Sequence, residues 1–202
     1  MKINLESVSK AFGYQPVFKD ITYSFESGNS YAILGANGSG KSTLVKSIIG
    51  YLTPSAGKIS WEDENSKSIH PDHYCQYISL VAPYVDVIEE LTLKEFLEFH
   101  FSFCTVNNTN KVLESTGLSK HQNKSLKLFS SGMKQRVKLA SQIYSNKPVI
   151  VLDEPTSNLD SEGKEWFQSL MMEIKNNAII LLASNEPSEY NFCDYQLKME
   201  DY

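Results

Sequence analysis

Two groups of residues in this sequence have the types and spacing that chemistry on a phosphate requires, and the first is a glycine-rich stretch. It reads Gly35-Ala36-Asn37-Gly38-Ser39-Gly40-Lys41-Ser42-Thr43 and fits the pattern G-x-x-x-x-G-K-S/T of a phosphate-binding loop (P-loop). Glycines let backbone N–H groups converge on phosphate oxygens, and a helix that begins after them adds a partial positive charge. We expect Lys41 to reach the β- and γ-phosphates and the Ser42 hydroxyl to bind Mg²⁺. The stretch therefore predicts a nucleotide site.

The second group is a pair of carboxylates that directly follows the apolar run Val149–Leu152. A phosphate-binding loop needs a carboxylate at the end of a neighbouring strand to hold Mg²⁺, and Asp153 meets that description. The adjacent Glu154 stands where it could polarise an attacking water as a general base. Together the two groups predict a site that binds a nucleotide with Mg²⁺ and attacks it with water.

The elements around these residues fit that reading. Residues 31–34 read as a short buried strand, and residues 44–49 carry apolar side chains at helical spacing until Gly50. The run Val149–Leu152 is typical of a parallel strand that is buried on both faces. Thr92 is a plausible N-cap for a helix over 93–103, and Ser130 for a long helix over 131–145.

Along the chain, strands alternate with helices, which predicts an α/β fold with a mainly parallel sheet. Alternating patterns at 3–9 and 17–25 predict an N-terminal antiparallel β subdomain, with a loop over Ala11–Pro16 between them. The stretch from about 83 to 145 reads as mostly helical and as an insertion. We therefore expect one domain, with a core of about 1–82 and 146–202. Further elements are expected as strands at 59–61, 77–81, 178–183 and 195–199, and as helices at 111–116 and from Asp160 or Ser161 to about 175.

Composition limits the class of protein. The chain has 202 residues, of which 41% are hydrophobic and 21% charged, as in a globular domain. Its net charge of 19 − 24 = −5 gives no electrostatic reason to expect a nucleic-acid partner. The three cysteines lie far apart, and no apolar run approaches the ~20 residues of a membrane span. We expect a cytoplasmic protein, so that any membrane-spanning part is supplied by another chain.

Two smaller clusters leave alternatives open. His70, His73 and Cys75 lie close together, but their spacing matches no four-ligand zinc pattern, which favours a surface loop. Apolar residues of the helix over 93–103 spread over about half of its circumference. Phe99 and Phe103 are therefore either part of a core among helices or part of a docking groove for a partner.

The sequence resembles that of ATP-binding cassette (ABC) ATPases in three motifs that occur in the family's order. Besides the P-loop, residues 149–160 resemble the Walker B motif and D-loop, ending Asp153-Glu154-Pro155-Thr156-Ser157-Asn158-Leu159-Asp160. Residues 129–136 resemble the family signature, LSGGQ followed by a basic residue, Gln and Arg, as Phe129-Ser130-Ser131-Gly132-Met133-Lys134-Gln135-Arg136. The resemblance covers nearly the whole chain.

The resemblance implies that two such chains enclose two ATP molecules, with Mg²⁺, between them. Ser130 and Gly132 are then expected to contact the γ-phosphate of ATP bound to the other subunit, and Asp160 of the D-loop to belong to the nucleotide-binding residues. Phe12 falls where family members place an aromatic ring on adenine, with Tyr14 as the alternative. The implied function is that of the ATPase subunit of a bacterial-type transporter, peripheral on the inner face of the cell membrane, which drives a separate membrane-spanning subunit.

Departures from the family pattern sharpen this expectation. Ser131 and Met133 replace signature residues in a way similar to several bacterial exporters, which favours export. The expected Q-loop glutamine falls on Pro83, and the expected switch histidine is Asn185, which cannot carry a proton at neutral pH as His can. We therefore expect ATP binding and dimer closure with slow hydrolysis. The alternative is a soluble ABC ATPase acting on nucleic acid or ribosomes, for which a basic surface would be expected.

Overall fold

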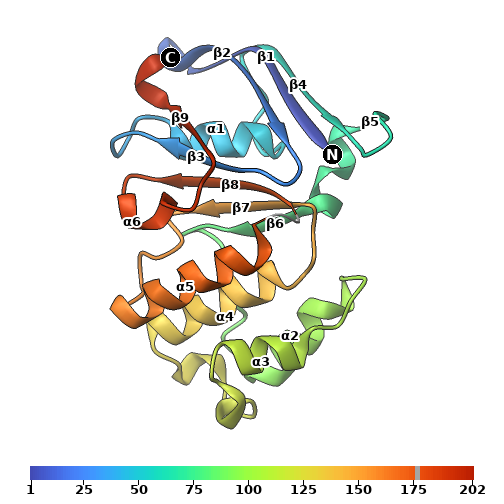
Figure 1. Cartoon of the computed structure of the whole chain (residues 1–202), viewed down its shortest axis with the longest axis vertical. Helices are drawn as coiled ribbons and strands as arrows, with labels where there is room; N and C mark the ends of the chain where they lie inside the picture. Colours follow the sequence, from blue (N-terminus) through green and yellow to red (C-terminus); the bar gives the residue numbers. More distant parts are fainter. Residues whose placement is uncertain (176–177) are drawn as a thin grey trace.

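The structure is a computed structural model, and it describes residues 1–175 and 178–202. It contains two sheets with helix α1 between them, and the other helices lie beyond the parallel sheet or beside it (Figure 1). The four-stranded antiparallel sheet has the order β2-β1-β4-β5, and the five-stranded parallel sheet has the order β6-β7-β8-β3-β9. This arrangement confirms the predicted fold class of an α/β core with a mainly parallel sheet and an antiparallel N-terminal part.

The strands of the antiparallel sheet are β1 (Lys2–Phe12), β2 (Gln15–Glu26), β4 (Ala56–Glu62) and β5 (Ser68–Ile69). Those of the parallel sheet are β3 (Ser30–Leu34), β6 (Ile78–Val81), β7 (Val149–Asp153), β8 (Ile179–Ser184) and β9 (Tyr195–Lys198). The helices are α1 (Lys41–Ile48), α2 (Leu93–Ser102), α3 (Thr109–Ser115), α4 (Ser131–Ile143), α5 (Ser161–Ile174) and α6 (Pro187–Tyr190). Short 3-10 segments are η1 (Pro71–Tyr77), η2 (Ser119–His121), η3 (Leu126–Leu128) and η4 (Met199–Asp201).

The predicted loop over Ala11–Pro16 is wrong. There β1 and β2 form a hairpin, with Phe12 opposite Gln15 and Ala11 opposite Pro16. The turn contains only Gly13 and Tyr14, and Gly13 has φ 59°, a conformation that glycine adopts without cost. The aromatic side chains in this stretch obscured the alternation that the strands follow.

The three inner strands of the parallel sheet, β7, β8 and β3, are buried on both faces, as the apolar run of β7 predicts. Val149 and Val151 point into a core that includes α1 and the antiparallel sheet, while Ile150 and Leu152 point to the opposite side. Helix α1 therefore fills the space between the two sheets, and α4 and α5 cover the other face of the parallel sheet (Figure 1). Burial on two sides fixes the ends of these strands, where the site residues lie.

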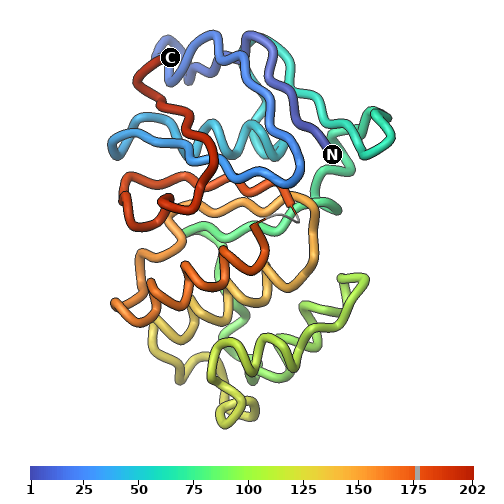
Figure 2. Tube along the Cα trace, viewed as in Figure 1, coloured from blue at the N-terminus to red at the C-terminus, as the bar shows by residue number. Residues whose placement is uncertain are grey.

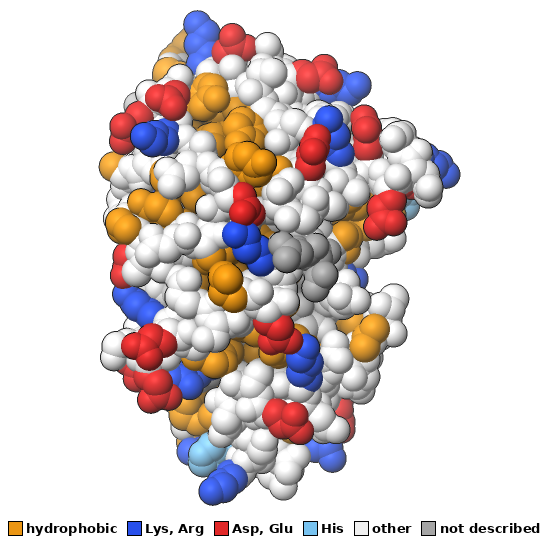
Figure 3. Space-filling view, in the orientation of Figure 1, with side chains coloured by type: hydrophobic (Ala, Val, Ile, Leu, Met, Phe, Trp, Pro, Cys, Tyr) orange, Lys and Arg blue, Asp and Glu red, His pale blue; other side chains and the backbone are white. Residues whose placement is uncertain are grey.

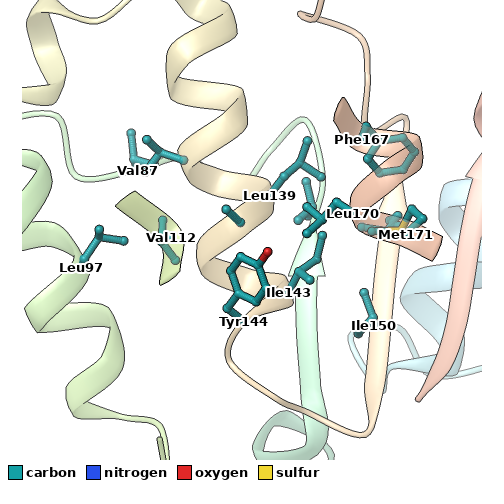
Figure 4. Close-up of a cluster of buried hydrophobic side chains, with 14 of the residues drawn as sticks. Val87, Leu97, Val112, Leu139, Ile143, Tyr144, Ile150, Phe167, Leu170 and Met171 are labelled. Atoms are coloured by element: carbon teal, nitrogen blue, oxygen red, sulfur yellow. The ribbon is translucent and has the colours of Figure 1, made fainter. Parts of the chain in front are cut away.

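The second core lies among helices. Figure 4 shows Leu139, Ile143 and Tyr144 of the α4 region between Ile150 of the sheet and Val112 of α3, with Leu170 and Met171 of α5 beside them. Figure 2 shows how the chain leaves the sheet region after β6, runs through α2 to α4, and returns in β7. This path matches the expected helical insertion.

Helix α2 begins as predicted. Thr92 is its N-cap, with the Thr92 Oγ1 accepting from the Glu95 N–H at 3.3 Å and Glu95 Oε2 accepting from the Thr92 N–H at 2.8 Å. Phe99 and Phe103 are 48% and 71% exposed, so they are not core residues. Within the part of the chain that the structure describes, no helix is long and apolar enough to cross a membrane.

Candidate nucleotide site

The site lies at the edge of the parallel sheet where its strands end (Figure 1). The P-loop follows β3, Glu154 follows β7 and Asn185 follows β8. Because the carboxyl ends of parallel strands share one edge, side chains that are 111 and 148 residues apart in sequence form hydrogen bonds here. A cleft of about 290 Å³ separates the P-loop and the first residues of α1 from Glu154 and Val17.

Lys41 is buried inside the loop. Only 5% of its surface is exposed, and its Nζ donates to the carbonyl oxygens of Gly35 at 2.7 Å and Ala36 at 3.1 Å. Among residues 1–175 and 178–202, no side chain caps α1, whose N-cap is Gly40 at φ 97°. The first N–H groups of α1 are thus free of side-chain acceptors beside a buried cation, which is an arrangement suited to a phosphate.

Ser42, at the start of α1, contacts Asp153 at the end of β7 directly. The Ser42 hydroxyl donates to Asp153 Oδ1 at 3.1 Å, and Asp153 is buried. Burial raises the pKa of the Asp153 carboxyl, and the charge of Glu154 adds to this, while Ser42, Lys46 and Lys41 lower it. A hydroxyl and a carboxylate oxygen about 3 Å apart are hard donors that suit adjacent positions around Mg²⁺. A divalent cation would also offset the cost of burying this charge.

Glu154 has an unusual backbone. Its φ is 48°, in the left-handed region that non-glycine residues rarely adopt, and its N–H donates to the Ala183 carbonyl oxygen of β8 at 3.0 Å. Such strain costs on the order of 1–3 kcal/mol and persists where the surroundings impose it, commonly at functional sites. The neighbouring strand therefore fixes the direction in which Glu154 enters the cleft.

Asn185 contacts the P-loop directly. Its Nδ2 donates to Asn37 Oδ1 at 3.1 Å. The predicted switch position thus lies beside the loop expected to hold the β- and γ-phosphates. Within the described residues, the buried Ser39 hydroxyl lacks a hydrogen-bond partner, so the loop also offers an unused polar atom to a ligand.

Tyr84 is a residue beside the site that no sequence motif indicated. Pro83, the position expected for the Q-loop glutamine, is exposed. The ring centroid of the next residue, Tyr84, lies 4.2 Å from Lys46 Nζ on α1. Burial raises the pKa of Tyr84 to about 12, and the charge of Asp153 is the second cause. The signal that could have indicated it is a side chain with a hydroxyl group three residues after the end of β6, the neighbour of β7.

The residues predicted from the signature and the D-loop do not line this cleft. Ser130 caps α4 through its Oγ, which accepts from the Met133 N–H at 3.2 Å, and Asp160 caps α5 through Oδ1, which accepts from the Gly163 N–H at 2.8 Å. Gly132 lies against the D-loop, because a Cβ there would stand 3.2 Å from the Asn158 carbonyl oxygen. Ser130 and Asp160 are exposed.

The two sets of residues nevertheless share one side of the molecule. In Figure 1 the P-loop, residues 154–160 and the N-terminal ends of α4 and α5 all lie toward the left. Phe12 stands 52% exposed at the end of the β1–β2 hairpin, where Lys10 Nζ lies 5.1 Å from its ring centroid. Val17 of the same hairpin reaches Gly40, so the hairpin borders the P-loop.

A parallel sheet with a P-loop, a strand-end carboxylate pair and a capped signature helix defines a P-loop nucleotide-binding ATPase. A family model described as ABC transporter matches residues 18–157, and the chain belongs to this family. Family membership implies ATP binding and hydrolysis in the service of transport.

Several relatives show how the family uses such chains. The chain is 27% identical to the uncharacterized ABC transporter ATP-binding protein YybJ of Bacillus subtilis (strain 168), over 98% of this chain and 92% of YybJ. It is 31% identical to the zinc import ATP-binding protein ZnuC of Wigglesworthia glossinidia brevipalpis, over 85% of this chain and 70% of ZnuC. It is 29% identical to the cytochrome c biogenesis ATP-binding export protein CcmA of Rhizobium etli, over 93% of this chain and 89% of CcmA.

A solved structure agrees with the fold. CbiO1 of Clostridium perfringens, described as part of the ABC transporter complex cbiONQ, superposes with a TM-score of 0.80 at 25% identity, over 97% of this chain and 83% of CbiO1.

Proposed function

We propose that two copies of this chain, or this chain and a homologous one, close on two ATP molecules and drive a separate membrane-spanning subunit. The observation that carries the proposal is the separation of the two phosphate-binding elements. Lys41, Ser42 and Glu154 line the P-loop cleft, and buried Asp153 is hydrogen-bonded to Ser42. The capped N-terminus of α4 is exposed elsewhere on the same side. A helix N-terminus presents N–H groups to an anion, so the signature segment complements a nucleotide held by a facing chain.

In this proposal each residue of the site has a distinct task. Lys41 and the P-loop amides bind the phosphates and stabilise the charge that develops during hydrolysis. Ser42 and Asp153 hold Mg²⁺, which neutralises phosphate charge when bound. Glu154 accepts a proton from the attacking water, and Asn185 donates a hydrogen bond to the γ-phosphate. Turnover is slow because Pro83 and Asn185 replace the glutamine and histidine of complete sites.

The membrane partner is supported by a groove on the opposite side from the P-loop. A hollow of about 690 Å³ lies between the end of α2 and the η1–β6 segment, and Figure 3 shows the outline indented on the right, where these elements lie in Figure 1. Phe103 lines the hollow, and its ring packs edge-on against exposed Phe99 at 5.1 Å between centroids. Two exposed aromatic rings beside a hollow suit an apolar segment of a partner chain.

The direction of transport is a further proposal. The Ser131 and Met133 replacements favour export, and CcmA is named as an export protein, whereas ZnuC is named as an import protein. The membrane subunit selects the substrate in either case.

Detergent extraction of membranes, followed by a pull-down on this chain, tests the proposal. We expect the chain to co-purify with membranes and to capture a multi-spanning protein. A Phe99→Asp/Phe103→Asp variant, which adds charge only at exposed positions, should lose this capture while keeping ATP binding. Co-purification with ribosomes instead would contradict the transporter role and support the alternative ATPase class.

A further inference from the structure

Glu189 is a buried carboxylate that none of the sequence motifs explains. It lies on the short helix α6, four residues after Asn185, and is 4% exposed. Carboxylates are rarely buried unless donors surround them, because removing the charge from water is costly. The groups that surround Glu189 therefore indicate what it is for.

Three donors from two different strand ends converge on this carboxylate. The Thr156 N–H donates to Glu189 Oε1 at 2.9 Å, and the Thr156 hydroxyl donates to the same oxygen. The Ser184 hydroxyl donates to Glu189 Oε2. Ser184 Oγ in turn accepts from the Glu186 N–H at 2.9 Å, so its own hydrogen is directed to Glu189.

These donors stand next to the two proposed catalytic positions. Thr156 follows Glu154 by two residues, and Ser184 directly precedes Asn185. The same two strand ends are also joined by the bond from the Glu154 N–H to Ala183. Asn185 continues the connection to the P-loop through Asn37. A single carboxylate therefore fastens the segment after β7 to the end of the neighbouring strand β8.

We propose that Glu189 is a positioning residue for ATP hydrolysis, which holds Glu154 and Asn185 in register at the ends of the neighbouring strands β7 and β8 without touching the nucleotide. The inference rests on the roles proposed above for those two residues. An ionised carboxylate only accepts hydrogen bonds, so it matches three donors, and bonds to a charged acceptor are the stronger kind. Glutamine has nearly the same shape but presents an NH₂ group to one of these donors, which leaves a buried mismatch.

The test separates turnover from binding. For Glu189→Gln we expect kcat for ATP hydrolysis to fall by about tenfold or more, because a charge-assisted hydrogen bond is lost. We expect KM and the affinity for a fluorescent ATP analogue to stay within about twofold of wild type. Glu173→Gln is the matched control, because Glu173 also joins elements through hydrogen bonds, to Lys111 and Tyr144, but away from the cleft. That variant should keep wild-type kcat. Melting temperatures confirm that each variant is folded at the assay temperature.

A second pair of variants covers the case in which Glu189→Gln does not fold. Thr156→Val removes the hydroxyl donor at nearly constant shape and should reproduce the loss of kcat. Thr156→Ser keeps the hydroxyl and should therefore keep the wild-type kcat. Wild-type kcat in folded Glu189→Gln, or equal kcat in the two Thr156 variants, would overturn the inference. Glu154→Gln is measured alongside: if it keeps wild-type turnover, the proposed function of the cleft fails, whatever the Glu189 variants show.

Discussion

Gly40 shows how tightly the P-loop is built at the scale of one residue. Two features of this position require glycine. The backbone has φ 97°, and a Cβ would stand 2.6 Å from Val17 Cγ1. Gly38 has φ 83° but open space around the Cβ position. Comparing the two glycines therefore distinguishes the effect of a left-handed backbone, which both share, from the effect of crowding, which only Gly40 has.

We predict that Gly40→Ala destabilises the protein more than Gly38→Ala. Both variants carry a left-handed alanine, at a cost of roughly 1–2 kcal/mol each. Gly40→Ala additionally overpacks against Val17, by about 1–3 kcal/mol. Urea unfolding of the two variants measures the difference, and adding Val17→Ala should recover part of the loss only in Gly40→Ala. Equal destabilisation of the two single variants would contradict the crowding argument.

Asn185 permits a prediction about catalysis. Asn185→Ala removes the bond to Asn37 and the proposed donor to the γ-phosphate, so we expect kcat to fall about fivefold, as for the loss of about 1 kcal/mol of hydrogen bonding. Asn185→His supplies a group that can carry a proton and should raise kcat above wild type. Steady-state phosphate release measures both. A histidine variant no faster than wild type would show that Asn185 does not limit turnover.

At the scale of elements, the two predicted N-caps offer a matched pair. Thr92 caps α2 and Ser130 caps α4, each through a side-chain oxygen that accepts from the N–H three residues on. We predict that Thr92→Ala and Ser130→Ala each cost about 1 kcal/mol of unfolding free energy. Only Ser130→Ala should also weaken ATP-driven association, because only that helix end is proposed to contact ATP held by a facing chain. Equal association in both variants would remove Ser130 from the ATP-binding residues.

Helix α2 also contains a titratable group. His100 Nε2 lies 2.7 Å from Ser145 Oγ and 3.1 Å from the Ser141 carbonyl oxygen. Burial lowers the pKa of His100, and the charge of Lys147 adds to this, although the bond to Ser141 opposes it. Because the pKa of His100 is lower in the folded state, the unfolded chain binds the proton at a higher pH than the folded protein does. His100 therefore favours the folded state above about pH 6.5, and this contribution is lost as the pH falls from there toward the folded-state pKa.

We therefore predict that stability falls between pH 7 and pH 5 less steeply in His100→Gln than in wild type. His73→Gln, which changes an exposed histidine of η1, should follow the wild-type slope. Urea unfolding at several pH values measures the slopes. Parallel curves for His100→Gln and wild type would contradict the assignment.

Local signals explain what the sequence could predict. Glycine spacing, the apolar run before Asp153 and the cap residues Thr92 and Ser130 each depend on neighbours in sequence, and the structure has these elements where they were expected. Tyr84 beside Lys46 and Glu189 beside Thr156 are contacts between distant segments, which no local pattern records. The hairpin at Phe12 was missed for a different reason, since its two-residue turn lies inside a stretch rich in aromatic residues.

At the scale of the whole molecule, the P-loop cleft and the α4 N-terminus lie on one side but do not meet within one chain. If a second chain completes each site, ATP should control assembly. We predict that Glu154→Gln, which keeps the shape of the side chain but cannot accept the proton, accumulates as an ATP-bound dimer with twice the monomer mass in light scattering. Adding Lys41→Ala should abolish this by removing the buried cation of the loop.

A surface control distinguishes closure through the signature face from any other association. Ser131 is exposed at the first turn of α4, so a tryptophan there leaves the monomer core untouched. In the Glu154→Gln background, Ser131→Trp should retain ATP binding but remain monomeric, because the bulky ring occupies the space that the facing nucleotide needs. A dimer that forms equally well with Ser131→Trp would place the contact on another face, and a Glu154→Gln protein that stays monomeric at saturating ATP and Mg²⁺ would refute the clamp.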